Sequence, residues 1–153
     1  MVKATVRWNI DAPADNVWTH IGGFFDVADI SETVAKSSRE NGNNRRITLA
    51  AGSPAGEPGK LTTGSEQFVE RLVMRDDQQR IFVYELLEAV NMSLPYDTYR
   101  GTARVYEDVP GKSCVFELTG TYTPDSFTEQ DARKDIEDFY GFCVKGVKKK
   151  LGL

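Results

Sequence analysis

The sequence is poor in the residues that build metal sites and disulfide frameworks. Its 153 residues include two cysteines, Cys114 and Cys143, and one histidine, His20. Two cysteines cannot form a disulfide framework, and free thiols are typical of the cytosol, so we expect a cytoplasmic protein. Three scattered Cys and His residues exclude a zinc site built from these ligands, and nothing around His20 indicates a catalytic triad. We therefore expect no metal and no other cofactor.

Long apolar runs and an excess of positive charge are missing as well. No segment approaches the roughly 20 apolar residues of a membrane helix, and the first residues alternate instead of forming a signal-peptide stretch. The chain has 19 Lys and Arg against 23 Asp and Glu, a net charge of -4. Nucleic acids and anionic membranes select positive surfaces, so we expect neither a nucleic-acid partner nor membrane insertion. The length and composition are those of one globular domain, residues 1–153.

The hydrophobic pattern predicts an α+β domain that begins with a strand and two short helices. Residues 2–10 alternate apolar and polar side chains, as a half-buried strand does. Asp11-Ala12-Pro13 is typical of a helix start, and Gly22-Gly23 ends this helix before a second short one. Turn signals such as Asn41-Gly42 then separate a series of strands, which makes their sheet antiparallel. These strands are expected near residues 33–40, 45–51, 65–75, 80–89, 97–107 and 113–123.

The last segment predicts a long helix that packs on this sheet. Thr128 and Asp131 resemble a capping box at its start. Apolar residues then repeat every three or four positions in one continuous stripe: Ala132, Ile136, Phe139, Tyr140, Cys143, Val147 and Leu151. A sheet that curves around a single helix leaves space between the two, so we expect an internal cavity. The Gly- and Pro-rich loop 52–64 is expected to rim its mouth, because long loops in compact domains are often functional.

Three motifs occur in an order that resembles one known superfamily. They are Ile10-Asp11-Ala12-Pro13-Ala14, Glu70-Arg71-Leu72 followed by Asp76-Asp77 and Arg80, and Thr98-Tyr99-Arg100-Gly101-Thr102. Over nearly the whole chain this order resembles the START-like helix-grip superfamily (SRPBCC), which includes the birch-pollen allergen family. The bacterial polyketide cyclase/dehydrase-like branch, related to the abscisic acid receptors, is the most similar. The resemblance implies a seven-stranded curved antiparallel sheet around a long C-terminal helix, with a small hydrophobic or aromatic ligand in the cavity.

The resemblance also implies site residues. The catalytic candidates fall on Glu70, Tyr99, Lys36 and Glu117. The ligand-binding candidates fall on Tyr84, Leu86, Gly101, Phe139, Cys143, Pro54 and Leu94. Pro54 belongs to a segment similar to the receptors' gate loop, Gly52-Ser53-Pro54-Ala55. Leu94 belongs to a segment that replaces their latch, and this difference argues against hormone reception.

Two of these candidates are in conflict with the residues around them. Strand alternation places Cys114, Phe116 and Leu118 on the inner face and leaves Glu117 in solvent, whereas the resemblance turns Glu117 inward. We follow the resemblance for Glu117. A lysine at position 36 is usually a surface residue. If Lys36 points inward, its ammonium needs a partner such as Glu70 or Glu117, because an isolated buried charge is unfavourable.

Two functions follow from these expectations. In the first, the protein is a cofactor-independent, cyclase/dehydratase-like enzyme that acts on an apolar or aromatic carbonyl-type, polyketide-like substrate. Glu70 or Glu117 is then the base, and Tyr99 or Lys36 is the acid or the donor to the developing oxyanion. In the second, the protein is a non-catalytic binding or transport protein for a hydrophobic small molecule. The sequence does not identify the ligand. It also does not decide the oligomeric state, for which a homodimer is one possibility.

Overall fold

The structure is a computed structural model that describes residues 1–54, 59–124 and 126–153. Its strands are β1 (Val2–Ile10), β2 (Val34–Arg39), β3 (Asn44–Leu49), β4 (Gln67–Asp76), β5 (Ile81–Val90), β6 (Tyr96–Val109) and β7 (Ser113–Pro124). Its helices are α1 (Ala14–Ile21), the 3-10 helix η1 (Phe24–Asp29) and α2 (Glu129–Lys150). The expected order of elements is therefore confirmed.

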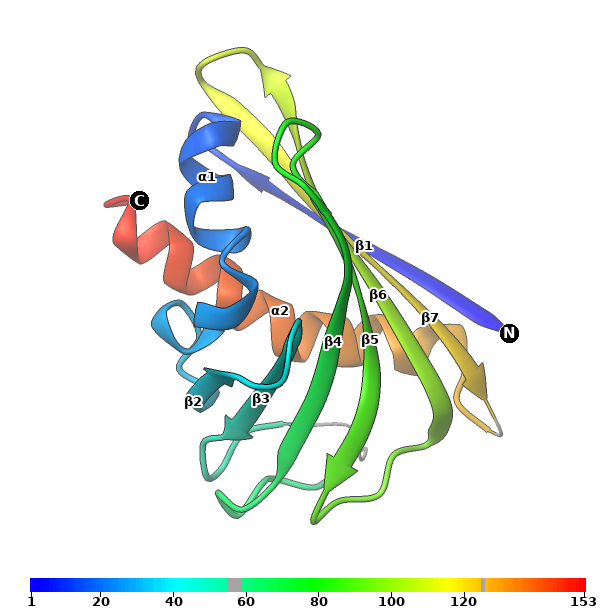
Figure 1. Ribbon diagram of the computed structural model, residues 1–153. Coiled ribbons are helices and arrows are strands. Elements are labelled where there is room, and N and C mark those ends of the chain that lie inside the picture. Colours follow the sequence, from blue (N-terminus) through cyan, green and yellow to red (C-terminus); the bar gives the residue numbers. More distant parts are fainter. Residues whose placement is uncertain (55–58, 125) are drawn as a thin grey trace.

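The seven strands form one antiparallel sheet in the order β1-β7-β6-β5-β4-β3-β2. The sheet curves, and α2 lies across its hollow side, with α1 and η1 near the C-terminal part of α2 (Figure 1). The helix-grip α+β fold predicted from the sequence is confirmed. Helix α2 packs most closely on β1, and the central strands β4, β5 and β6 face residues 135–140 of this helix.

Helix α2 begins and packs as its sequence predicts. The Thr128 hydroxyl accepts the backbone N–H of Asp131, and the Asp131 carboxylate accepts the backbone N–H of Thr128, which completes the capping box. The buried side chains of the helix are Ala132, Ile136, Tyr140, Cys143, Val144 and Val147. Phe139 and Leu151, also expected in the stripe, are only partly buried. Phe139 is thus placed beside the core, where it can contact a ligand.

The stem of the loop between β3 and β4 is held by hydrogen bonds. Gly52 donates its N–H to the Thr62 carbonyl, and Thr62 donates its N–H to the Ser53 carbonyl. The buried hydroxyl of Thr62 donates to the Ala50 carbonyl at 2.5 Å. Ala55, the last residue of the predicted gate segment, lies outside the described residues. No helix in the described part of the chain combines the length and the apolar character needed to cross a membrane.

Candidate functional site

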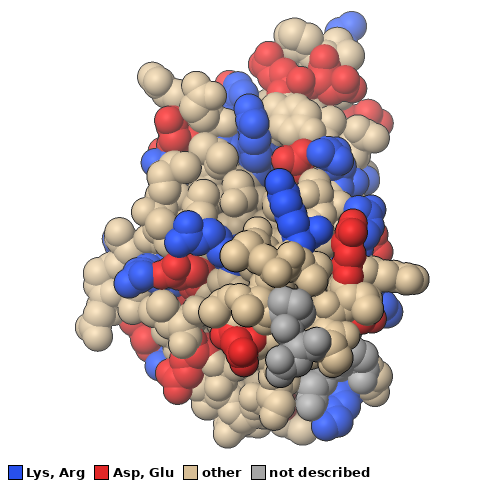
Figure 2. Space-filling view, turned by 90° about the vertical axis from the view of Figure 1, so that its right-hand side faces the viewer, with Lys and Arg blue, Asp and Glu red and all other residues tan. Residues whose placement is uncertain are grey.

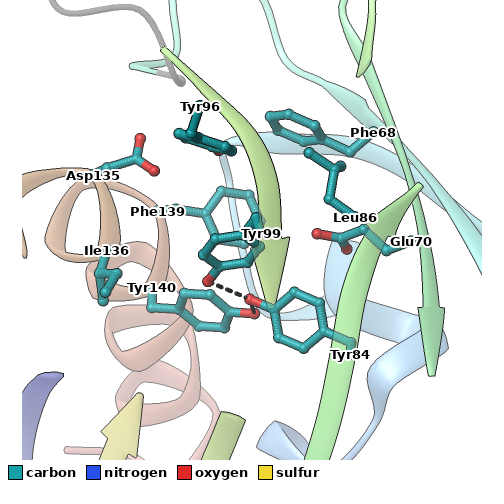
Figure 3. A pocket seen from close by; sticks show the side chains of 10 residues that line it. All are labelled: Phe68, Glu70, Tyr84, Leu86, Tyr96, Tyr99, Asp135, Ile136, Phe139 and Tyr140. Atoms are coloured by element: carbon teal, nitrogen blue, oxygen red, sulfur yellow. Dashed lines mark hydrogen bonds between the residues drawn. The ribbon is translucent and has the colours of Figure 1, made fainter. Parts of the chain in front are cut away.

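A cavity of about 50 Å³ lies between the hollow side of the sheet and α2 (Figure 3). This space holds roughly three to five water molecules. Strands β4, β5 and β6 and helix α2 supply its walls. The lining side chains are Phe68, Glu70, Tyr84, Leu86, Tyr96, Tyr99, Asp135, Ile136, Phe139 and Tyr140.

Three tyrosine hydroxyls form a hydrogen-bonded chain at one end of the cavity (Figure 3). Tyr140 donates to the Tyr84 oxygen at 2.6 Å, and the Tyr84 and Tyr99 oxygens are 2.9 Å apart. Each hydroxyl has one proton. If Tyr84 donates to Tyr99, every proton within the chain has an acceptor and the Tyr99 proton is left for the cavity. The opposite order would leave the buried Tyr84 proton without an acceptor among the described residues, which is unfavourable.

The tyrosines act as hydrogen-bond donors because they stay protonated. Burial, assisted by neighbouring tyrosines, raises the pKa of Tyr84 and of Tyr99 well above the usual range. Burial likewise raises the pKa of Tyr140, although the nearby Arg45 charge acts in the opposite direction. The Tyr99 hydroxyl is therefore suited to donate a hydrogen bond to an oxygen atom of a ligand.

A glycine in the neighbouring strand makes room for this chain. Tyr84 on β5 pairs with Gly101 on β6, and a Cβ atom at position 101 would lie 2.3 Å from Cζ of Tyr84. Any larger residue at position 101 would displace the tyrosine ring. Gly101 thus sets the position of Tyr84 and does not line the cavity itself.

A buried ion pair holds another polar group of the cavity lining, the carboxylate of Glu70. Arg45 on β3 is opposite Glu70 on β4, and these residues are 2% and 7% exposed, respectively. Nε and Nη2 of Arg45 each lie 2.7 Å from Oε2 of Glu70. Nη1 donates to the Phe24 carbonyl at 2.6 Å, and the guanidinium lies 3.8 Å from the centre of the Phe24 ring. These contacts fix Glu70 with its carboxylate directed into the cavity (Figure 3).

The guanidinium of Arg45 remains charged in this environment. Burial lowers its pKa, but the charge of Glu70 and the two neighbouring tyrosines Tyr140 and Tyr84 raise it, and the net change is upward. Oε1 of Glu70 accepts no hydrogen bond from the described residues. Oε2 of Glu70 therefore binds Arg45, and Oε1 is available to accept a hydrogen bond in the cavity.

A family model described as "Polyketide cyclase / dehydrase and lipid transport" matches residues 1–152. The chain belongs to this family. No functionally curated protein matches it significantly. The chain is thus identified by its family, polyketide cyclase/dehydrase and lipid transport.

Solved structures show the same fold. The protein XoxI from Bacillus cereus is 23% identical with a TM-score of 0.77, and the match covers 98% of this chain and 95% of that one. A protein from Thermobifida fusca is 19% identical with a TM-score of 0.71, over 99% and 94% of the two chains. The Zhui aromatase/cyclase from a Streptomyces species is 18% identical with a TM-score of 0.66, over 98% and 93%. At these identities the likeness concerns the fold alone.

Within this polyketide cyclase/dehydrase family member, the cavity brings together five of the residues singled out from the sequence. They are Glu70, Tyr84, Leu86, Tyr99 and Phe139. Their convergence was expected from the resemblance, and the curved sheet produces it. Their roles toward a ligand are taken up under the proposed function.

Three further ligand-binding candidates lie elsewhere. Cys143 lines a second cavity of about 10 Å³ on the other side of Tyr140, where burial raises the pKa of its thiol to about 12. Pro54 bridges to Leu61 in the stem of the β3–β4 loop, and Leu94 packs on the edge of the core. None of the three lines the larger cavity.

The inward orientation of Glu117 is wrong. Cys114, Phe116 and Leu118 on β7 are fully buried, so the intervening Glu117 lies on the outer face. There it accepts a hydrogen bond from Arg7 at 2.7 Å and one from the Tyr106 hydroxyl at 3.3 Å. Figure 2, which shows the side of the molecule at the right of Figure 1, has acidic and basic side chains interspersed over its surface. Strand alternation, not the resemblance, gave the correct orientation.

The inward orientation of Lys36 is also wrong. Val34 is buried, and simple alternation would place Lys36 on the same face. A bulge between these residues shifts the register of β2, so Lys36 is exposed. Ser37 takes the inner position and accepts the backbone N–H of Ala28 at 3.2 Å. Lys36 and Glu117 therefore do not join Glu70 and Tyr99 in one cluster.

The sequence interpretation missed the cation that contacts Glu70. Arg45, Ile47 and Leu49 alternate on β3 and are all buried, so alternation alone indicates that Arg45 points inward. An arginine at an inner position needs a carboxylate partner, and Glu70 was already a candidate. The sequence interpretation also passed over five other lining residues as site candidates: Phe68, Tyr96, Asp135, Ile136 and Tyr140. In the described part of the chain, no group of three or more His, Cys, Asp and Glu side chains is placed to hold a metal ion.

Proposed function

We propose that the protein binds a small, largely apolar molecule that carries a carbonyl-type oxygen, and that Tyr99 donates a hydrogen bond to this oxygen. The observation that supports the proposal most is the hydroxyl chain from Tyr140 through Tyr84 to Tyr99. The buried hydroxyls of Tyr140 and Tyr84 donate their protons within this chain. The Tyr99 hydroxyl is therefore polarised, and its proton is available to a ligand. Donation through a chain of hydroxyls strengthens the last hydrogen bond.

The other walls suit an apolar ligand body. Phe68, Leu86, Ile136 and Phe139 offer only carbon atoms, and the tyrosines add their ring faces. Such a combination of apolar walls with a few polar groups is typical of small-molecule sites. The two free cysteines are buried, which fits a reducing compartment such as the cytoplasm.

The volume restricts the ligand that fits without rearrangement. A cavity of about 50 Å³ is smaller than the roughly 150 Å³ of a protein cavity that binds benzene, and typical sites for drug-sized molecules enclose roughly 300–1,000 Å³. Even a single ring therefore requires partly buried side chains such as Tyr96 and Phe139 to move aside, and a multi-ring polyketide requires a larger rearrangement. A single-ring carbonyl compound, which needs the smallest movement, is therefore the ligand class that we assign to this cavity.

A pair of isosteric probes tests the proposed hydrogen bond. Acetophenone and α-methylstyrene have nearly the same shape, but only the first has an oxygen acceptor. We expect acetophenone to bind roughly two- to tenfold more tightly in titrations followed by NMR of the labelled protein, the usual range for one hydrogen bond. Tyr99→Phe should abolish this preference. Tyr84, the next residue of the chain, is only 1% exposed, so its hydroxyl cannot replace that of Tyr99.

Tyr106→Phe is the matched control for this experiment. Its hydroxyl contacts Glu117 on the outer face, so its removal should leave the preference unchanged. The proposal fails if neither probe binds, or if Tyr99→Phe retains the preference for acetophenone.

Acid/base catalysis of the cyclase/dehydratase kind is a second candidate, and the available oxygen of Glu70 favours it. In this reaction the Glu70 carboxylate removes a proton from the carbon next to the ligand carbonyl, and Tyr99 stabilises the negative charge that develops on the carbonyl oxygen. Return of a proton from Glu70 restores the ketone. Formation of such an enolate is the first step of an aldol-type cyclisation.

Deuterium exchange measures this step without knowledge of the natural substrate. In heavy water, enolisation replaces the methyl hydrogens of bound acetophenone by deuterium, which NMR detects. We expect exchange above the buffer rate and a loss of roughly a hundredfold in Glu70→Gln. Tyr106→Phe again serves as the control. Binding without any exchange would leave a non-catalytic binding or transport protein as the function.

A further inference from the structure

We propose that Tyr122 is a second hydrogen-bond donor to the ligand, and that the ligand carries a second oxygen atom, close to its carbonyl oxygen, which accepts this bond. The inference rests on the proposed function, because it adds a polar contact for the molecule that the same cavity takes. It is drawn from a buried hydroxyl that lacks a partner and from the position of this hydroxyl beside Tyr99.

The Tyr122 hydroxyl is buried without a hydrogen-bond partner. Tyr122 lies on β7 and is 0% exposed, and its oxygen makes no hydrogen bond to the described residues. Burial raises the pKa of this hydroxyl above its usual range, so it keeps its proton. A buried hydroxyl whose proton has no acceptor is unfavourable, and such groups are rare in native proteins. A ligand oxygen that reaches Tyr122 therefore gains a hydrogen bond that the free protein does not make.

Tyr122 lies beside the tyrosine that the proposed function uses. Tyr99 on β6 and Tyr122 on β7 are directly paired, and their ring centres are 4.9 Å apart. Burial is the main cause that raises the pKa of Tyr99, and the nearby Tyr122 is the next. The two phenol groups are therefore close neighbours on the inner face of the sheet.

Two facing glycines leave room for the hydroxyls. The next pair of residues on the same face of β6 and β7 is Gly101 and Gly120. A Cβ atom at position 120 would lie 2.7 Å from the Tyr122 oxygen. One at position 101 would lie 2.5 Å from the Tyr84 oxygen, to which the Tyr99 hydroxyl is bonded. Facing positions of neighbouring strands are about 5 Å apart, so one small ligand can reach both the Tyr99 and the Tyr122 hydroxyls.

The ring of Tyr96 lies between Tyr122 and the cavity. Tyr96 lines the cavity and packs edge-on against Tyr122, with the ring centres 5.0 Å apart. Tyr122 is not among the described residues that line the cavity. Tyr96 is only partly buried, and it is one of the side chains that a bound ring has to displace. Movement of Tyr96 therefore enlarges the cavity toward Tyr122.

A pair of ketones with and without a second oxygen tests the inference. Ortho-methoxyacetophenone and ortho-ethylacetophenone have nearly the same shape and the same carbonyl group, but only the first has a second acceptor. Their dissociation constants are measured by NMR of the labelled protein. The ratio of the two constants is compared between the wild type and Tyr122→Phe, so that the different hydration of the free probes cancels. We expect Tyr122→Phe to reduce the relative affinity for the methoxy compound roughly two- to tenfold, the range of one hydrogen bond, and an unchanged ratio overturns the inference.

Two other tyrosine variants locate the effect. Tyr106→Phe removes a hydroxyl on the outer face and should leave the ratio unchanged. Tyr99→Phe should remove the preference for acetophenone over α-methylstyrene but leave the methoxy-to-ethyl ratio unchanged, because the two donors contact different oxygens. If Tyr99→Phe lowers this ratio as much as Tyr122→Phe does, the inference is overturned.

Thermal unfolding of the ligand-free protein is a test that needs no probe. Tyr122→Phe keeps the ring that packs against Tyr96 and Tyr99 and removes only a hydroxyl without a partner. Its melting temperature should therefore equal or exceed that of the wild type, whereas Tyr84→Phe, which breaks two hydrogen bonds, should lower it. A lower melting temperature of Tyr122→Phe would show that the hydroxyl stabilises the fold and would overturn the inference.

The outcomes separate this inference from the proposed function. If acetophenone binds with a preference that depends on Tyr99, but Tyr122→Phe leaves the methoxy-to-ethyl ratio unchanged, the inference alone fails. If none of the three ketones binds, the proposed function fails with it.

Discussion

Removal of the negative charge from the buried ion pair is the most informative perturbation of this fold. Glu70→Gln keeps the size of the side chain and one acceptor oxygen but removes the charge that balances Arg45. An arginine cannot shed its proton in a protein interior, so the variant leaves a positive charge in a site that is 2% exposed. Breaking a buried pair in this way costs several kcal/mol.

The size of the effect follows from the geometry of the pair. Two nitrogens of Arg45 contact one oxygen of Glu70 at 2.7 Å, and the third nitrogen is bound to the Phe24 carbonyl. The Phe24 contacts remain in Glu70→Gln, and the amide oxygen can still accept a hydrogen bond. We therefore expect a loss at the lower end of the range for buried pairs, about 3 kcal/mol in the free energy of unfolding. In a chain of this size that loss lowers the melting temperature by roughly 6–12 °C.

Glu117→Gln provides a control with the same chemistry at the same distance. Glu117 also contacts an arginine at 2.7 Å, but the two side chains, Arg7 and Glu117, are 60% and 21% exposed. Exposed pairs contribute little because water and salt screen them, so the melting temperature should change by less than about 3 °C. Thermal and urea unfolding, followed by circular dichroism, compare the two variants.

Equal destabilisation by Glu70→Gln and Glu117→Gln would refute the reasoning, because the larger expected loss is assigned to the burial of the Arg45–Glu70 pair. A double variant, Arg45→Met with Glu70→Leu, removes both charges at once. Apolar replacement of a whole buried pair is often neutral, so this variant should recover most of the lost stability. A recovered fold that no longer exchanges the methyl hydrogens of acetophenone would indicate that the pair serves function more than stability.

Two further predictions concern the packing of α2 and the free thiols. Gly146→Ala should be strongly destabilising in thermal unfolding, because its Cβ would lie 1.5 Å from the Ile30 carbonyl oxygen, whereas Gly141→Ala meets nothing within 4 Å and should stabilise the helix by up to about 1 kcal/mol. Equal effects of the two alanines would contradict the close helix contact. Burial raises the pKa of Cys143 to about 12 and that of Cys114 to about 11, so both thiols should resist alkylation by iodoacetamide at pH 8 until the protein is unfolded. Rapid labelling of the native protein would contradict their burial.

The fold could be predicted because its signals are local and repeated. The stripe on α2, the capping box at Thr128 and the alternation in β1 and β7 each depend on a few neighbouring residues, and the structure confirms all of them. Several such signals in a fixed order are sufficient for the helix-grip architecture. The same rule of alternation also gave the correct outward orientation of Glu117.

The site was harder to predict because it depends on register and on pairing between strands. A single bulge after Val34 moves Lys36 from the inner to the outer face, and nothing in the local sequence marks this bulge. Arg45 was detectable by alternation, but its partner follows only from the pairing of β3 with β4. A polar cluster assembled from several strands is therefore sensitive to each register in turn.

The cation that contacts Glu70 is Arg45 and not Lys36, and this difference changes the chemistry of the cavity. A lysine in the cavity, as the resemblance suggested for Lys36, would be a flexible point charge able to contact a ligand carboxylate or carbonyl. The structure instead has Arg45, whose planar guanidinium contacts Glu70, the Phe24 carbonyl and the Phe24 ring. Positive charge is thus used to hold a carboxylate in place, and the groups left to meet a ligand are carboxylate oxygens, hydroxyls and aromatic faces. Such walls suit the neutral, acceptor-bearing ring of the proposed function, whereas an inward lysine would have suited an anion.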